Sequence, residues 1–188
     1  MARRKGNRDH KENETGASEE MKIYLGLVHY PVLNKFNDIV TTSITNLDIH
    51  DIARTCKTFG IKKFFIINPL ETQKQLLGRI LRFWKSDNAE IYNSDRVTAL
   101  SEVEYSESIE NTIEYIKNQE EERPVIITTT AANLEAQINF EEFKKIVRPV
   151  LLLFGTGNGL APEIHTKADH ILSPVIGTTG YNHLSVRS

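Results

Sequence analysis

Short runs of Val, Ile and Leu alternate, from residue 21 onward, with stretches whose apolar residues recur at helical spacing. Each run has the length of a strand rather than of a helix. Continuous apolar strands separated by helices are typical of a mostly parallel sheet covered on both faces. The sequence therefore predicts an α/β fold, a mostly parallel sheet flanked by helices. The predicted strands are Ile23–Val28, Phe64–Ile67, Pro124–Thr129, Val150–Phe154 and His170–Ser173.

Helical spacing predicts three helices, over Ile49–Phe59, Glu71–Lys85 and Glu107–Asn118. In the first, an apolar stripe runs through Ile52 to Phe59, and the next residue is a glycine suited to end a helix. In the second, Arg79, Arg82 and Lys85 lie opposite the apolar face. This basic row suits phosphate binding, and an ordinary solvated helix face explains it equally well.

The composition predicts one folded domain, residues 21–188, because 188 residues with 39% hydrophobic side chains form one core of ordinary size. Residues 1–20 are charged and nearly devoid of apolar side chains, which predicts a disordered tail. Its basic part, Ala2–Arg8, could touch RNA or only aid solubility. A formal net charge of −2 means that any RNA site is a local patch.

Several protein classes are disfavoured. A single Cys56 excludes an internal disulfide framework and favours a reducing, cytoplasmic setting. No apolar run approaches the roughly 20 residues that span a bilayer, and the N-terminus has no signal-peptide core, so we expect no membrane partner. The six histidines match no metal-binding spacing, and we expect no metal.

Three loops rich in small residues follow the last three predicted strands: Thr128–Ala131, Gly155–Gly159 and Pro174–Gly180. Ligands of open α/β sheets lie beyond the carboxyl ends of the strands, and glycine lets the backbone approach a ligand closely. The three loops therefore predict a small-molecule pocket, although each glycine alone is equally explained by a tight turn. Neither the phosphate-binding G-x-x-x-x-G-K-[ST] loop nor the dinucleotide G-x-G-x-x-G fingerprint occurs.

The segment Asn46–Gly60, with Arg54 followed by a small residue and then Phe-Gly, resembles the first motif of SpoU-type RNA methyltransferases. The loops at Gly155–Leu160 and Leu172–Val186 resemble the second and third motifs of the same SPOUT superfamily. Together with Leu27–Val32, they are similar to a small bacterial branch of that superfamily. The resemblance implies a fold with a C-terminal trefoil knot that binds S-adenosylmethionine, and a final helix cut short at Ser188.

The resemblance also implies a role for each matching position. Arg54 would be the catalytic residue, near the methyl acceptor and across a homodimer interface; a permanently charged guanidinium suits phosphate anchoring better than proton removal. A plain surface arginine is the alternative. The implied cofactor-binding residues are Thr129, Gly155, Gly157, Gly159, Ser173, Ile176 and Leu184, and the implied RNA-binding residues are Asn46, Arg54, Asn182 and Ser185.

We therefore expect an S-adenosylmethionine-dependent methyltransferase that acts on structured RNA, tRNA or rRNA, in the cytoplasm. The acceptor is left open between a ribose 2′-hydroxyl and a base nitrogen, because Ser185 stands where the family has Asn, and Gly157-Asn158 where it usually has an acidic residue. The alternative is a non-catalytic RNA-binding or interaction module that keeps the fold.

Overall fold

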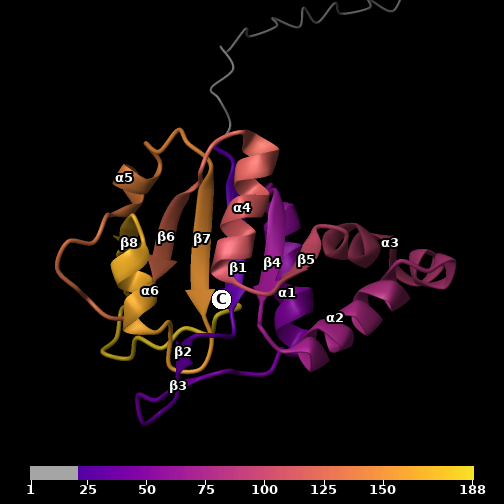
Figure 1. Ribbon diagram of the computed structural model, residues 1–188, viewed down its shortest axis with the longest axis horizontal. Helices are drawn as coiled ribbons and strands as arrows, with labels where there is room; N and C mark the ends of the chain where they lie inside the picture. Colours follow the sequence, from indigo (N-terminus) through magenta and orange to yellow (C-terminus); the bar gives the residue numbers. More distant parts are fainter. Residues whose placement is uncertain (1–20) are drawn as a thin grey trace, which may run out of the picture.

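A six-stranded parallel sheet forms the centre of the molecule in a computed structural model that describes residues 21–188 (Figure 1). The predicted disordered tail, residues 1–20, lies outside the described residues. Neighbouring strands pair in parallel in the order β5-β4-β1-β7-β6-β8, which confirms the predicted mostly parallel sheet. The strands are β1 (Ile23–Val28), β4 (Lys63–Ile67), β5 (Val103–Ser106), β6 (Val125–Thr129), β7 (Val150–Gly155) and β8 (His170–Leu172).

The alternating side chains of β4 divide the core between the two faces of the sheet. Phe64 and Ile66 pack with buried residues of α1 (Asn46–Thr58), α2 (Glu71–Trp84) and α3 (Asp87–Leu100). Phe65 and Ile67 pack on the other face, with α4 (Ile109–Glu120) and α6 (Pro162–Lys167). Helices therefore cover both faces, as predicted. The remaining elements are the short antiparallel pair β2 (Val32–Leu33) and β3 (Ile39–Val40), and α5 (Phe140–Phe143).

Helix α1 starts earlier than the periodicity predicts, because Thr45 caps it: the Thr45 side chain accepts a hydrogen bond from the backbone N–H of Asp48. The predicted apolar stripe is wrong at its end. Phe59 is 76% exposed, since α1 ends at Thr58 and the chain turns away from the core there. Ile52 and Cys56 of the same stripe are buried as expected.

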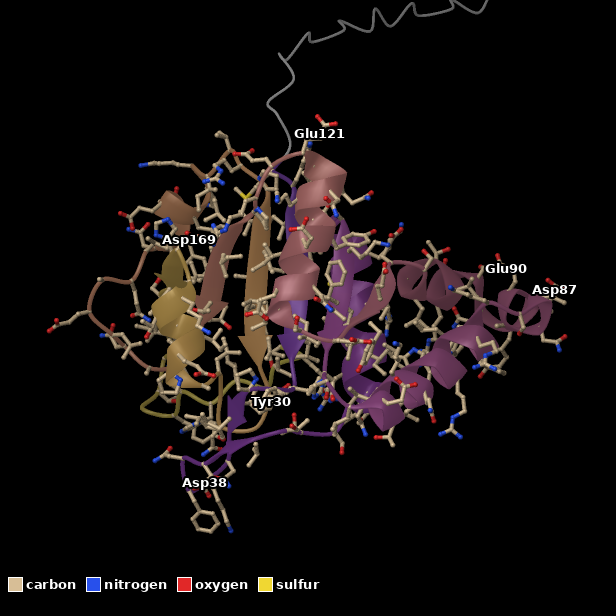
Figure 2. All side chains as sticks on the ribbon, viewed as in Figure 1. Tyr30, Asp38, Asp87, Glu90, Glu121 and Asp169 are labelled. Atoms are coloured by element: carbon tan, nitrogen blue, oxygen red, sulfur yellow. The ribbon has the colours of Figure 1, made fainter. Side chains whose placement is uncertain are left out.

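Helix α3 and strand β5 were not predicted. The backbone of α3 is non-helical at Asn93, whose side chain accepts a hydrogen bond from the backbone N–H of Arg96 and so begins the second half of the helix. Because of this break, the apolar residues of α3 do not recur at one continuous helical spacing, which is the pattern that predicts a helix. Together, α2 and α3 form a projection beyond the β5 edge of the sheet, and Asp87 and Glu90 lie at its far end (Figure 2).

The predicted final helix is absent from residues 173–188, so this expectation is wrong for the chain as it stands. The segment closes only one turn, in which Ser188 N–H donates to the Ser185 carbonyl, and a helix requires successive bonds four residues apart. It instead runs from β8 to α1. There Val186 packs against the core, and Arg187 lies 3.4 Å from carboxylate oxygens of both Asp48 and Asp51.

Candidate cofactor and RNA site

The three glycine- and threonine-rich loops lie at one edge of the sheet, because β7, β6 and β8 are neighbours and run in the same direction. Thr129, at the end of β6, donates from its hydroxyl to the carbonyl of Leu153 on β7, at 3.0 Å. Asn182, in the segment after β8, donates to the carbonyl of Ala131, at 3.1 Å. Side-chain hydrogen bonds thus join the end of β6 and its loop to β7 and to the segment after β8.

The glycine loop after β7 depends on close backbone contacts. A Cβ on Gly155 would lie 2.6 Å from the backbone nitrogen of Leu160, and one on Gly157 would lie 2.7 Å from the carbonyl oxygen of Leu33. Gly157 and Gly159 also have positive φ angles, 60° and 105°, which favour glycine. A Cβ on Gly159 would meet nothing within 4 Å, so open space remains beside this residue.

The segment after β1 packs on the glycine loop, and sequence reasoning missed this contact. Leu33 N–H donates to the Gly159 carbonyl at 2.9 Å, while Asn158 N–H donates to the Leu33 carbonyl at 2.8 Å. Ala161 N–H donates to the Pro31 carbonyl. The close neighbour at Gly157 is therefore the chain's own backbone. The only sequence signal was the short Val32-Leu33 apolar pair after Pro31. Figure 2 labels Tyr30 at this end of the sheet.

A buried hydrogen-bond chain connects His29 to the same loop. Thr156 donates to the Val28 carbonyl at 3.0 Å, so its hydroxyl accepts the proton of Thr42. Thr42 in turn accepts from His29 Nδ1, at 3.0 Å. This order of donors assigns the proton of the neutral ring to Nδ1 and leaves Nε2 as a buried acceptor without a partner. Burial lowers the pKa of His29 to about 4, which agrees with a neutral ring.

The residues after β8 present apolar side chains beside polar backbone. Ile176 is 75% exposed and Leu184 is 63% exposed. Ser173 N–H donates to the Ile138 carbonyl, which fixes the start of the segment, and the Ser185 side chain accepts from the Arg187 N–H. Exposed apolar side chains and an open glycine loop, which follow strands at the same edge of the sheet, suit an adenosyl group, which needs an apolar cover and backbone hydrogen-bond partners. The residues present therefore fit S-adenosylmethionine.

Arg54 is not brought together with the three loops within one chain. Asn46 begins α1 at the carboxyl edge of the sheet, and α1 then runs back toward the amino ends of the strands. Arg54 follows eight residues later, which corresponds to about 12 Å along the helix axis. It is exposed and has no side-chain partner among residues 21–188.

The described residues offer neither a metal site nor a membrane span. Within residues 21–188, no three side chains of His, Cys, Asp or Glu gather in a group that could hold a metal ion. No helix in the same part of the chain has the length and apolar character needed to cross a membrane.

This chain matches a family and relatives described as RNA methyltransferases. A family described as SAM-dependent RNA methyltransferase matches residues 22–188. A tRNA (guanine-N(1)-)-methyltransferase of Oleidesulfovibrio alaskensis is 45% identical over 168 residues, which cover 88% of this chain and 39% of that protein. A protein of Aquifex aeolicus is 32% identical over 170 residues, which cover 88% of this chain and 83% of that protein.

The fold also resembles that of the SpoU methyltransferase AviRb from Streptomyces viridochromogenes, solved in complex with AdoMet. The TM-score is 0.52 at 13% identity, over 92% of this chain and 57% of that one, so the likeness concerns the fold. The chain spans about two fifths of the length of the Oleidesulfovibrio alaskensis protein and of a tRNA (guanine-N(1)-)-methyltransferase of Nitratidesulfovibrio vulgaris, 39% in each case. Because the family match extends over residues 22–188, this chain belongs to the SAM-dependent RNA methyltransferase family.

Proposed function

We propose that this chain transfers a methyl group from S-adenosylmethionine to a structured RNA, tRNA or rRNA, in the cytoplasm. The observation that carries the proposal is the meeting of the three loops after β6, β7 and β8, joined by the Thr129 and Asn182 hydrogen bonds, in a chain of this family. The cofactor, when bound, supplies an electrophilic methyl group on a sulfonium. The protein's task is then to bind and align the two reactants.

The cofactor would be held mainly by backbone atoms of Thr129, Gly155 and Ser173, with Ile176 and Leu184 covering it. The open space beside Gly159 supports this arrangement. The path of residues 173–188 from β8 to α1 supports a trefoil knot that closes the pocket, because the last segment passes the carboxyl edge before Arg187 reaches Asp48 and Asp51.

Arg54 would act in the site of a second copy of the chain. Its distance along α1 from the carboxyl edge and its lack of a partner among residues 21–188 support a homodimer in which each Arg54 anchors an RNA phosphate at the other subunit's pocket. Arginine is permanently charged, so it binds phosphate well and is a poor proton acceptor. Asn46, Asn182 and Ser185 would contact the same RNA.

The methyl acceptor is a ribose 2′-hydroxyl or a base nitrogen, and similar proteins carry both descriptions. The curated relative is named for guanine N1, but this chain matches 39% of it. A solved structure entitled for 2-OH methylation of C/U34 on tRNA has a TM-score of 0.53 at 15% identity, and 88% of that chain is covered. The two acceptors give products that mass spectrometry of digested RNA separates.

Two measurements test the proposal. Calorimetry should show binding of S-adenosylmethionine and S-adenosylhomocysteine, and absence of binding to both would favour a non-catalytic RNA-binding module. Incubation with RNA and labelled cofactor should then label the RNA. Arg54→Ala should keep cofactor binding and lose most of the labelling, whereas Lys57→Ala, which removes an exposed charge from the same helix, should change neither. Unchanged labelling with Arg54→Ala would remove Arg54 from the site.

A further inference from the structure

A hollow of about 420 Å³ lies where α1, α2 and α3 meet. Small-molecule sites in proteins are typically about 300–1,000 Å³, so the size suits a small ligand. The polar side chains that line it come from all three helices: Asn46 and His50 from α1, Arg79 from α2 and Arg96 from α3.

The lining of the hollow is positively charged and contains no carboxylate. Neither Arg79 nor Arg96 forms an ion pair with any residue between 21 and 188. A guanidinium group without a counter-charge beside apolar surface favours an anionic ligand. The charge of the hollow therefore selects against cations and neutral lipids.

Two buried polar atoms of residues that line the hollow lack partners. His50 is only 8% exposed, and its Nδ1 makes no hydrogen bond; the buried Nε of Arg96 also makes none. Burial and the nearby Arg96 charge lower the pKa of His50, so the ring is neutral and can accept or donate one bond at Nδ1. Buried polar groups are normally paired, so these two atoms, which lie behind the surface of the hollow, are exceptions.

Two aromatic rings form most of the apolar part of the hollow. The Trp84 ring is held by the edge of His50, with centroids 5.3 Å apart, and by the Arg96 guanidinium, 5.4 Å from its centroid. Phe83 stands perpendicular to Trp84 and is 57% exposed, so much of its surface is uncovered, and Ile80 completes this wall. An exposed aromatic ring beside arginines is a surface on which nucleic-acid bases stack.

We propose that this hollow binds a nucleotide, with the base against Phe83 and Ile80 and the phosphate at the positive charges of Arg79 and Arg96. The two arginines suit an anion and the exposed Phe83 ring suits a stacked base, and a nucleotide combines the two. The nucleotide is part of an RNA strand or free in solution, and the test below separates these sources. The hollow shares Asn46 with the proposed RNA-binding residues, but its nucleotide binding does not depend on methyl transfer.

Trp84 is the only tryptophan of the chain, so its fluorescence reports on the hollow directly. The full chain is titrated with uridine 5′-monophosphate and with a short single-stranded oligouridylate at low salt, in the presence of saturating S-adenosylhomocysteine. We expect both to quench Trp84. Tighter binding of the oligouridylate identifies an RNA strand as the ligand, and equal binding per nucleotide identifies a free nucleotide.

The variants decide whether the hollow is the site. Arg79→Ala should weaken binding about tenfold, the loss expected for one charge-assisted contact. Arg96→Ala should do the same, and Arg79→Ala remains decisive if Arg96→Ala disturbs the packing on Trp84. Arg82→Ala, which removes an exposed charge from the same helix outside the hollow, is the matched control.

Three outcomes overturn the proposal: no quenching by either probe, quenching that Arg79→Ala leaves unchanged, and equally tight binding of inorganic phosphate alone. Because these readings use Trp84 rather than methyl transfer, they stand even if the chain fails to bind S-adenosylhomocysteine. Failure of calorimetric cofactor binding would count against the proposed enzyme, and failure of quenching would count against the hollow alone.

Discussion

At the scale of single residues, Gly155 is the position where the fold has no room for a side chain. Its Cβ would lie 2.6 Å from the Leu160 nitrogen and 2.8 Å from the Gly159 carbonyl carbon, both of them backbone atoms. Since backbone cannot move aside without opening the turn, Gly155→Ala should lower the free energy of unfolding by about 1–3 kcal/mol in urea titrations. Gly78→Ala is the control, because a Cβ there meets nothing within 4 Å inside α2. It should raise stability by about 0.5–1 kcal/mol. Similar losses in both variants would contradict the role given to Gly155.

His29 is the residue through which we expect pH to act on stability. Its pKa is about 4 in the folded chain, below the ordinary value of about 6.5 expected after unfolding. The unfolded chain therefore binds a proton first as the pH falls, so stability is full above about pH 6.5 and declines toward pH 4. His29 alone contributes a slope of about 1.4 kcal/mol per pH unit in this window.

The slope of His29→Asn, measured by urea unfolding at a series of pH values, should be smaller by that amount. Burial also lowers the pKa of His165 and His50, so part of the slope should remain. His183→Asn, at an exposed position, serves as the control and should keep the full slope. An unchanged slope with His29→Asn would show that the ring takes up its proton without unfolding.

At the scale of elements, the sequence predicted those whose pattern is continuous. Strands β1, β4, β6 and β7 are apolar runs because both of their faces are buried, and the sheet order confirms them. Helix α3 escaped prediction because the break at Asn93 divides its periodicity. Strand β5 escaped because it has only four residues, lies at the edge and contains the polar residues Glu104 and Ser106. So short a mixed run leaves a weak pattern.

The N-terminal cap of α1 determines where the helix that carries His50 and Arg54 begins. Thr45 accepts a hydrogen bond from the Asp48 N–H at 3.1 Å, so Thr45→Ala leaves an N–H of the first turn without that partner. We expect a loss of about 1 kcal/mol in the free energy of unfolding. Thr55→Ala removes an exposed hydroxyl from the middle of the same helix and should cost less than about 0.5 kcal/mol. An equal cost for both would argue against capping.

At the scale of the whole molecule, only one feature of the candidate site could be predicted from the sequence, namely which loops lie at the same edge of the sheet. The rule that ligands lie at the carboxyl ends of parallel strands correctly placed the loops after β6, β7 and β8 at one edge. The packing of Leu33 on Gly157 and Gly159 could not be predicted, because it joins distant segments by backbone bonds that leave no side-chain pattern. The position of Arg54 relative to the loops likewise required the direction of α1.

We expect ligands to order the two proposed sites separately, the loop edge and the α2–α3 projection, and hydrogen exchange distinguishes them. S-adenosylhomocysteine should slow exchange in residues 155–161 and 173–186, because binding stabilises the closed loops. At about 100-fold above the dissociation constant, the gain of about 2.7 kcal/mol corresponds to about 100-fold slower exchange where opening requires release of the ligand. Residues 87–100 of α3 should exchange as before, and methionine, which lacks the adenosyl group, is the control ligand. Protection confined to residues 71–100 would place the nucleoside in the hollow instead, and would contradict a cofactor pocket at the carboxyl edge of the sheet.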